Sequence, residues 1–208
     1  MFSTFIKKMK PVILIVAFFV STAWQQQQTR VISDCTIFFT VTSSTQPDVG
    51  SKVIYIKGKD IRVDFISNVY SQTMISGKNG GTTILKTVGQ SKYVANYSYE
   101  EWKKHNDIYS GIQTSITEET KKILDYTCKK AILTLKNGTS YAVYYVPGLI
   151  PSVKENFFEF NDVPGLVLEY ESIGSDNKNV IYTATKIDFK PVPAAQFEIP
   201  KSGYRILH

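Results

Sequence analysis

The hydrophobic positions along most of this chain recur at every second residue, the spacing of β-strands with one apolar face. Ile61, Val63 and Phe65 share one face of their segment, and the residues between them, Arg62 and Asp64, point the other way. The segment from residue 35 to residue 42 repeats this alternation. The pattern predicts about nine strands, spaced at short intervals along the chain.

Glycine and asparagine mark the turns that join these strands. Gly58-Lys59 and residues 78–81 are hairpin signals. Asn137-Gly138 suits a type I′ turn, because both central residues of that turn need positive φ. Residues 147–164 contain several prolines and read as a connection between strands.

Two segments are the least strand-like. Residues 100–104 and residues 117–124 are expected to form short helices or ordered loop. In the second segment, Glu118 and Lys122 stand four residues apart, a spacing that suits a helix. The expected fold class is therefore mainly β: a single curved antiparallel sheet, shaped as a half-barrel, with one or two short helices.

The N-terminus has the three parts of a secretory signal peptide. Lysines precede an unbroken apolar run, Val12–Val20, and small residues precede a cut after Ala23. That run is about half the length that crosses a bilayer, which makes a retained span the weaker interpretation. We expect a signal peptide at 1–23, a flexible segment at 24–33 and a single β-rich domain at 34–208, exported to the periplasm or the medium, with outer-membrane association as a further option.

Charge argues against nucleic acid as a partner. The whole chain carries a net charge of +6, and loss of the three lysines in 1–23 leaves +3 on the mature protein. The remaining lysines are scattered along alternating segments, whereas nucleic-acid binding needs a concentrated basic face.

The two cysteines, Cys35 and Cys128, leave two interpretations open. An even count in an exported protein favours a disulfide, which would close a loop of about 90 residues. The alternative is a pair of buried thiols that act as small apolar residues. The residues before Cys35 do not form a lipid-attachment signal.

The sequence offers little for catalysis or metal binding. Its two histidines are His105, in a polar stretch, and His208, at the C-terminus, and neither lies near a cysteine or a second histidine. Nucleophilic catalysis needs a base held against the nucleophile, and zinc sites need clustered ligands. We therefore expect no enzyme activity, no metal and no cofactor.

Tyrosines recur on the predicted strands, and large amphipathic rings on a curved sheet suit a groove for an apolar ligand. An ordinary packed sheet explains them as well. The candidate ligand-binding residues are Tyr141, Val143 and Tyr145, or the opposite face with Tyr144, together with Tyr93.

Residues 120–131, which run T-K-K-I-L-D-Y-T-C-K-K-A, resemble the central segment of GLPGLI-family proteins. The resemblance continues to the segment V-P-G-L-V-L-E-Y at 163–170, similar to the family's naming motif; its specific positions here are Cys128, Pro164, Gly165 and Leu166. Asp125 departs from the usual turn glycine, and residues 161–163 depart from the usual opening of the naming motif. The resemblance implies an exported Gram-negative envelope protein of unassigned activity with a fold like that of lipoprotein carriers.

Three interpretations of the function follow from these observations. The first is a non-enzymatic envelope protein that binds an apolar or acylated ligand, such as a lipid, in the concavity of its sheet. The second is a structural or protein-interaction module, with an envelope protein as partner, whose concavity is filled. An enzyme is the third and weakest interpretation, and a cleft that sets His105 against a carboxylate and a hydroxyl would strengthen it.

Overall fold

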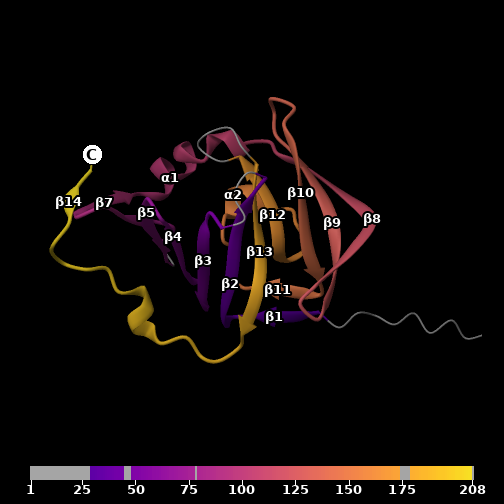
Figure 1. The fold of residues 1–208 in the computed structure, drawn as a ribbon, viewed down its shortest axis with the longest axis horizontal. Helices are drawn as coiled ribbons and strands as arrows, with labels where there is room; N and C mark the ends of the chain where they lie inside the picture. The colour runs from indigo at the N-terminus through magenta and orange to yellow at the C-terminus, as the bar shows by residue number, and fades with distance from the viewer. Residues whose placement is uncertain (1–28, 45–47, 78, 174–178, 208) are drawn as a thin grey trace, which may run out of the picture.

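One large sheet dominates the computed structural model, which describes residues 29–44, 48–77, 79–173 and 179–207 (Figure 1). The sheet has 12 strands, antiparallel in every pair except β14–β7. In spatial order they are β14 (Arg205–Ile206), β7 (Ser91–Tyr97), β6 (Thr82–Val88), β5 (Tyr70–Ser76), β4 (Asp60–Ser67), β3 (Gly50–Lys57), β2 (Asp34–Ser43), β13 (Asn179–Asp188), β12 (Gly165–Ile173), β10 (Ser140–Pro147), β9 (Tyr126–Thr134) and β8 (Gln113–Ile123).

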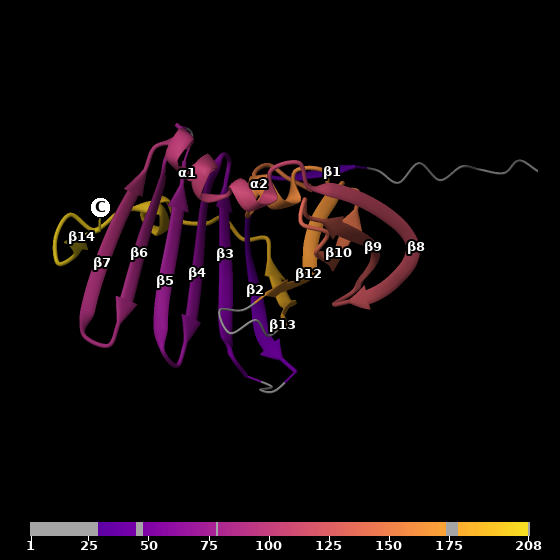
Figure 2. The same cartoon turned by 90° about the horizontal axis from the view of Figure 1, so that it is seen from above.

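The sheet is curved, and Figures 1 and 2 show its β8–β9 end turning away from the β7–β4 end. Register shifts interrupt the pairing in β10 at Tyr144/Tyr145, in β13 at Ala184/Lys186 and in β8 at Ile116/Thr120. Each such bulge bends its strand and increases the local twist. The predicted fold class, a mainly β protein built on a single curved antiparallel sheet with short helices, is confirmed.

Two short helices lie along one end of the strands β3–β7 (Figure 2). Helix α1 (Tyr99–His105) starts with a capping box, in which the Ser98 hydroxyl accepts from the Glu101 amide and the Ser98 amide donates to the Glu101 carboxylate. The helix expected at 100–104 is thus confirmed. A 3₁₀ turn, η1 (Asp107–Tyr109), follows it, and α2 (Phe157–Phe160) lies in the connection before β12.

The short helix or ordered loop expected at 117–124 is wrong, because residues 117–123 belong to β8. This edge strand is exposed along most of its length, so neither face shows an apolar period. Its pairing with β9 decides its conformation, and its charged side chains suit an unpaired edge.

The hairpin at Asn137-Gly138 is confirmed, but its type I′ turn is not. Gly138 has φ of 84°, whereas Asn137 does not have positive φ. The Leu135 amide donates to the Thr139 carbonyl, which encloses three loop residues. A three-residue loop needs only one left-handed position, and the glycine supplies it.

Cys35 and Cys128 are free, fully buried thiols in one core cluster, so the predicted disulfide is wrong and the alternative interpretation holds. They lie on β2 and β9, which three other strands separate in the sheet. A disulfide needs Cα atoms within about 7 Å of each other. Burial raises the pKa of each thiol to about 11.

Short strand β1 (Arg30–Ile32), within the segment expected to be flexible, pairs in parallel with β11 (Leu149–Pro151). The predicted signal peptide, 1–23, lies outside the described residues.

After β13, the C-terminal segment runs outside the sheet to its far edge, on the side away from the helices (Figure 1). The Val192 amide donates to Asp34 on β2, and Arg62 on β4 donates to the Gln196 carbonyl in η2 (Ala194–Phe197). The segment ends as β14 beside β7, where the Leu207 amide donates to the Val94 carbonyl.

Candidate functional site

A cavity of about 920 Å³ lies between one face of the sheet and the segments that carry the helices. Alternate residues of β4 and β5 form its sheet wall: Ile61, Val63 and Phe65, then Tyr70, Gln72, Met74 and Ser76. The predicted common face of Ile61, Val63 and Phe65 is confirmed by this wall. The opposite wall comes from α1, from η1 and from residues 151–159. Volumes of this size are typical of small-molecule sites.

A buried lysine joins the two walls. Lys52 on β3 is 3% exposed, and its Nζ lies 2.5 Å from Glu155 Oε1 and 2.6 Å from the Tyr170 hydroxyl. The same Nζ lies 4.5 Å from the ring centroids of Phe39 and Tyr170 and 4.7 Å from that of Tyr182. Burial lowers the pKa of Lys52, while the Glu155 carboxylate opposes this shift.

Tyr170 and Tyr182, on the paired strands β12 and β13, stack at 4.6 Å with planes 4° apart. The Tyr170 hydroxyl donates to Glu155 at 3.3 Å, which completes a triangle with Lys52. Burial raises the pKa of both phenols, that of Tyr182 to about 12. Both tyrosines therefore stay neutral, and both line the cavity.

A second carboxylate, Glu159 of α2, is 6% exposed, and among the described residues it accepts hydrogen bonds from neutral donors. The Tyr141 hydroxyl donates to it at 2.9 Å, and the Asn156 side-chain amide at 3.1 Å. Desolvation raises the pKa of Glu159 to about 7, against the opposing effect of these two bonds. Burial and the neighbouring Glu159 carboxylate in turn raise the pKa of Tyr109.

Lys154 holds the connection in shape. Its Nζ donates to the carbonyls of Phe160 at 2.8 Å and Val163 at 3.0 Å, and also to that of Asn161. One ammonium thereby satisfies three acceptors and fixes the loop that presents Glu155 and Glu159 to the cavity.

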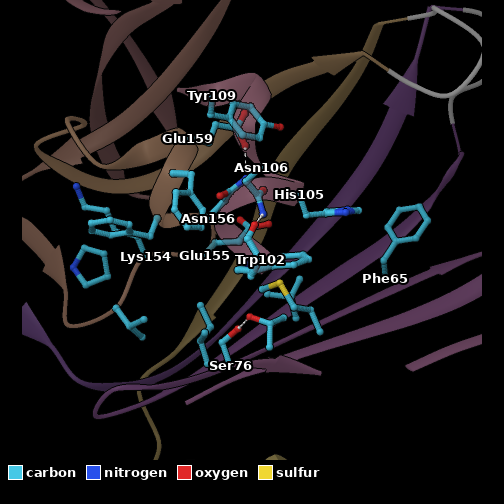
Figure 3. Close-up of a pocket in the computed structure, with 18 of the residues that line it drawn as sticks. Phe65, Ser76, Trp102, His105, Asn106, Tyr109, Lys154, Glu155, Asn156 and Glu159 are labelled. Atoms are coloured by element: carbon cyan, nitrogen blue, oxygen red, sulfur yellow. Dashed lines mark hydrogen bonds between the residues drawn. The ribbon is translucent and has the colours of Figure 1, made fainter. Parts of the chain in front are cut away.

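Figure 3 shows Glu155, Asn156 and Glu159 on one side of the hollow, near Asn106 and Tyr109. His105 lines the same cavity, and its recorded contacts are with rings: it stacks on Trp102 at 5.1 Å and lies 5.6 Å from Tyr97. The arrangement that would strengthen an enzyme interpretation, His105 against a carboxylate and a hydroxyl, is not among these contacts.

The predicted ligand-binding residues lie outside the lining of this cavity. Val143 and Tyr145 are buried in a core cluster with Phe160, and Tyr144 is on the other face, where its hydroxyl donates to Glu119. Tyr93 pairs with Arg205 of β14. Tyr141 comes nearest, because it binds the cavity residue Glu159.

The residues of the motif that resembles the GLPGLI family lie in the core or at the turn before β12. Leu166 is buried in the core cluster that contains Cys128. A Cβ on Gly165 would lie 2.3 Å from the Val146 carbonyl oxygen. Pro164 is exposed just before β12 starts at Gly165, as expected of a turn that leads into a strand.

Sequence reasoning missed Lys52, Glu155 and Glu159. Lys52 occupies the same face of β3 as buried Ile54 and Ile56, which was the one available signal. The carboxylates lie in the connection at 147–164, which has no periodicity to read.

The family model described as "N-glycanase peptide, N-terminal domain" matches residues 49–203. The chain belongs to this family. No curated protein matches it in sequence.

The comparison with solved structures gives several that the chain is similar to. PNGF-II is 15% identical with a TM-score of 0.47, over 83% of this chain and 30% of that chain. An uncharacterised conserved protein from Thermus thermophilus is 9% identical with a TM-score of 0.49, and the match covers 85% of this chain and 91% of that chain. A LolA superfamily protein from Nitrosomonas europaea is 9% identical with a TM-score of 0.34, and the match covers 81% of this chain and 91% of that chain. The chain thus spans less than a third of the PNGF-II chain.

Within the described residues, no helix has the length and apolarity to cross a membrane, and no group of three or more His, Cys, Asp or Glu side chains is arranged to hold a metal ion.

Proposed function

We propose that this member of the N-glycanase N-terminal domain family is a non-enzymatic binding module that takes an apolar or acylated ligand into the cavity between its sheet and its helices. The observation that carries the proposal is the cavity of about 920 Å³ with its apolar sheet wall. A concave, mostly apolar site with a few convergent polar groups is the usual form of a small-molecule site.

The alternative function, a structural or protein-interaction module with a filled concavity, suits the other end of the sheet. There Leu133, Val143 and Tyr145 pack against Phe160 and leave a filled core. The space under α1 weighs against this alternative, since a purely structural sheet gains stability from close packing of that face.

The ionisable groups of the cavity support binding rather than catalysis. Lys52 and Glu155 form an ion pair, and the Lys154 ammonium is hydrogen-bonded to backbone carbonyls. These charged groups hold the walls of the cavity in place and can orient a ligand. The resemblance to GLPGLI-family proteins supports an exported protein of the Gram-negative envelope, and the first 23 residues support passage through the secretory pathway.

Titration of the delipidated full chain with N-phenyl-1-naphthylamine, a neutral apolar probe, tests the proposal. We expect saturable binding in the micromolar range and a change in Trp102 fluorescence, because Trp102 lines the cavity. Met74→Trp places a bulky ring in the cavity and should weaken binding by about tenfold or more. Ser71→Trp, on the other face of the same strand, is the matched control.

Linear, non-saturating probe fluorescence up to high micromolar concentrations would reject the proposal. So would equal loss of binding in the Met74→Trp and Ser71→Trp variants, because the bound probe would then lie elsewhere.

A further inference from the structure

We propose that the cavity selects amphiphiles with a cationic head group, namely an alkyl chain that ends in a primary or quaternary ammonium. This inference rests on the proposed function and specifies its ligand class. It is carried by the charges and rings that face the cavity, in four observations.

The cations of the cavity wall are already engaged or lie at the rim. Lys52 is held by Glu155 and Tyr170, and Lys154 by three carbonyls. Lys59 is exposed in the turn between β3 and β4. An anionic head group that enters the cavity therefore meets no available cation at depth among the described residues, and its desolvation is not compensated.

The anions are not balanced in the same way. Glu155 has Lys52, but no ion pair of the described residues includes Glu159, whose two recorded hydrogen bonds come from the neutral donors Tyr141 and Asn156. Once ionised, Glu159 is a buried carboxylate in a cavity wall. A cationic head group would supply the partner that such a charge requires.

Aromatic side chains of α1 and η1 line the same wall of the cavity as this carboxylate. Tyr109 lies beside Glu159, and Trp102 lies one helical turn from Asn106 on the segment that leads to Tyr109 (Figure 3). The faces of Trp and Tyr attract ammonium groups, most strongly trimethylated ones. The protein already uses this contact at Lys52, which lies over three rings.

The apolar wall suits the alkyl chain. Ile61, Val63 and Phe65 follow one another on β4, and Met74 is paired with Val63 on β5. Five residues of extended strand cover roughly 13 Å, the scale of a medium-length alkyl chain.

The test compares C12 amphiphiles that differ only in the head group, below their micelle concentrations, as competitors of N-phenyl-1-naphthylamine on the delipidated full chain. At pH 8.5 we expect dodecyltrimethylammonium to compete about tenfold better than dodecanoate, the change that one charge-assisted contact gives. The ammonium charge does not titrate, so its pH dependence reports on the protein.

Affinity for dodecyltrimethylammonium should fall several-fold between pH 8.5 and pH 5.5 as Glu159 is protonated. The charged and titratable groups that face Glu159 are Tyr109 of η1, Tyr141 of β10, Glu155 of the connection and Lys52 of β3. His105 of α1 also lines the cavity. Glu159→Gln should therefore abolish the pH dependence, and His105→Gln should retain it.

Equal competition by the two head groups, or a preference for dodecanoate, overturns this inference while the proposed function stands, because the neutral probe still binds. A pH dependence that survives in Glu159→Gln overturns it too. If neither the probe nor the ammonium shows saturable binding, the proposed function fails and the inference with it.

Discussion

Lys52 and Glu155 are 103 positions apart in the chain, and their side chains meet at 2.5 Å inside the fold. This contact ties strand β3 to the connection before α2. Both residues line the cavity, and their contact holds the carboxylate next to the Tyr170 hydroxyl.

Lys52→Ala should destabilise the protein by about 3 kcal/mol, because removal of one partner leaves the other charge with little solvent. Equilibrium urea unfolding measures the change. Lys52→Met combined with Glu155→Gln should recover part of the loss, since it removes both charges. Lys186→Ala, at an exposed pair with Asp188, is the matched control and should cost less than about 1 kcal/mol. Equal losses in the two alanine variants would contradict the buried pairing.

Gly165→Ala should be strongly destabilising. The added Cβ would lie 2.3 Å from the Val146 carbonyl oxygen and 2.6 Å from the Tyr145 ring, and backbone cannot move aside without breaking the β10–β12 pairing. We expect a loss of about 3 kcal/mol, or failure to fold. Thermal unfolding should show Pro164→Ala, next to it and exposed, within about 1 kcal/mol of wild type. A Gly165→Ala protein as stable as wild type would refute the close approach of the two strands.

Stability should fall as the pH rises from about 4.5 to about 7. Glu159 has a pKa of about 7 when folded, against 4.5 for an unburied glutamate, so the folded protein binds the extra proton in this window. The contribution of Glu159 protonation to the free energy of unfolding is fully present below pH 4.5 and is lost as the pH rises through 7. It amounts to about 3 kcal/mol at most. Urea unfolding of wild type and Glu159→Gln across pH 4.5–8.5 isolates it.

Glu100→Gln, on the exposed side of α1, is the control for that series and should follow wild type. Were the Glu159→Gln and wild-type curves to stay parallel across the window, the buried carboxylate would not be the group that titrates.

The two thiols should be inert in the folded protein. Thiolate is the reactive form, and with a pKa of about 11 it is scarce at pH 8. We expect no rapid reaction of Cys35 or Cys128 with Ellman's reagent in buffer, and reaction of both in denaturant without reductant. A mobility change on reduction in gel electrophoresis would instead reveal a disulfide.

The alternation of apolar and polar residues made most of the sheet predictable. In β2, β3 and β4 one face is apolar, and this pattern is visible within the sequence of each strand. Strand β8 was not predictable in this way. Residues 117–122 carry polar side chains on both faces, and pairing with β9 makes the strand extended. The spacing of Glu118 and Lys122 fits a helix equally well, and tertiary contacts overrode it.

The cavity was foreseen as a concavity, but its chemistry was not. Tyrosines on β10 seemed the best lining, yet Val143 and Tyr145 are core residues because Phe160 packs onto them. From the sequence alone, Lys52 would be expected to be solvated. It is buried because the connection at 152–160 folds over it. Contacts between segments about 100 residues apart leave no local pattern in the chain.

The C-terminal segment also has a mechanical consequence. It binds β2 through Asp34, β4 through Arg62 and β7 through Val94, so it works as an external strap across half of the sheet. We expect the strands that the segment binds to open together, because β2, β4 and β7 must each first break a hydrogen bond to it. Hydrogen exchange in β4–β7 should accordingly follow one shared opening event, and the cavity wall formed by β4 and β5 inherits the rigidity of that unit.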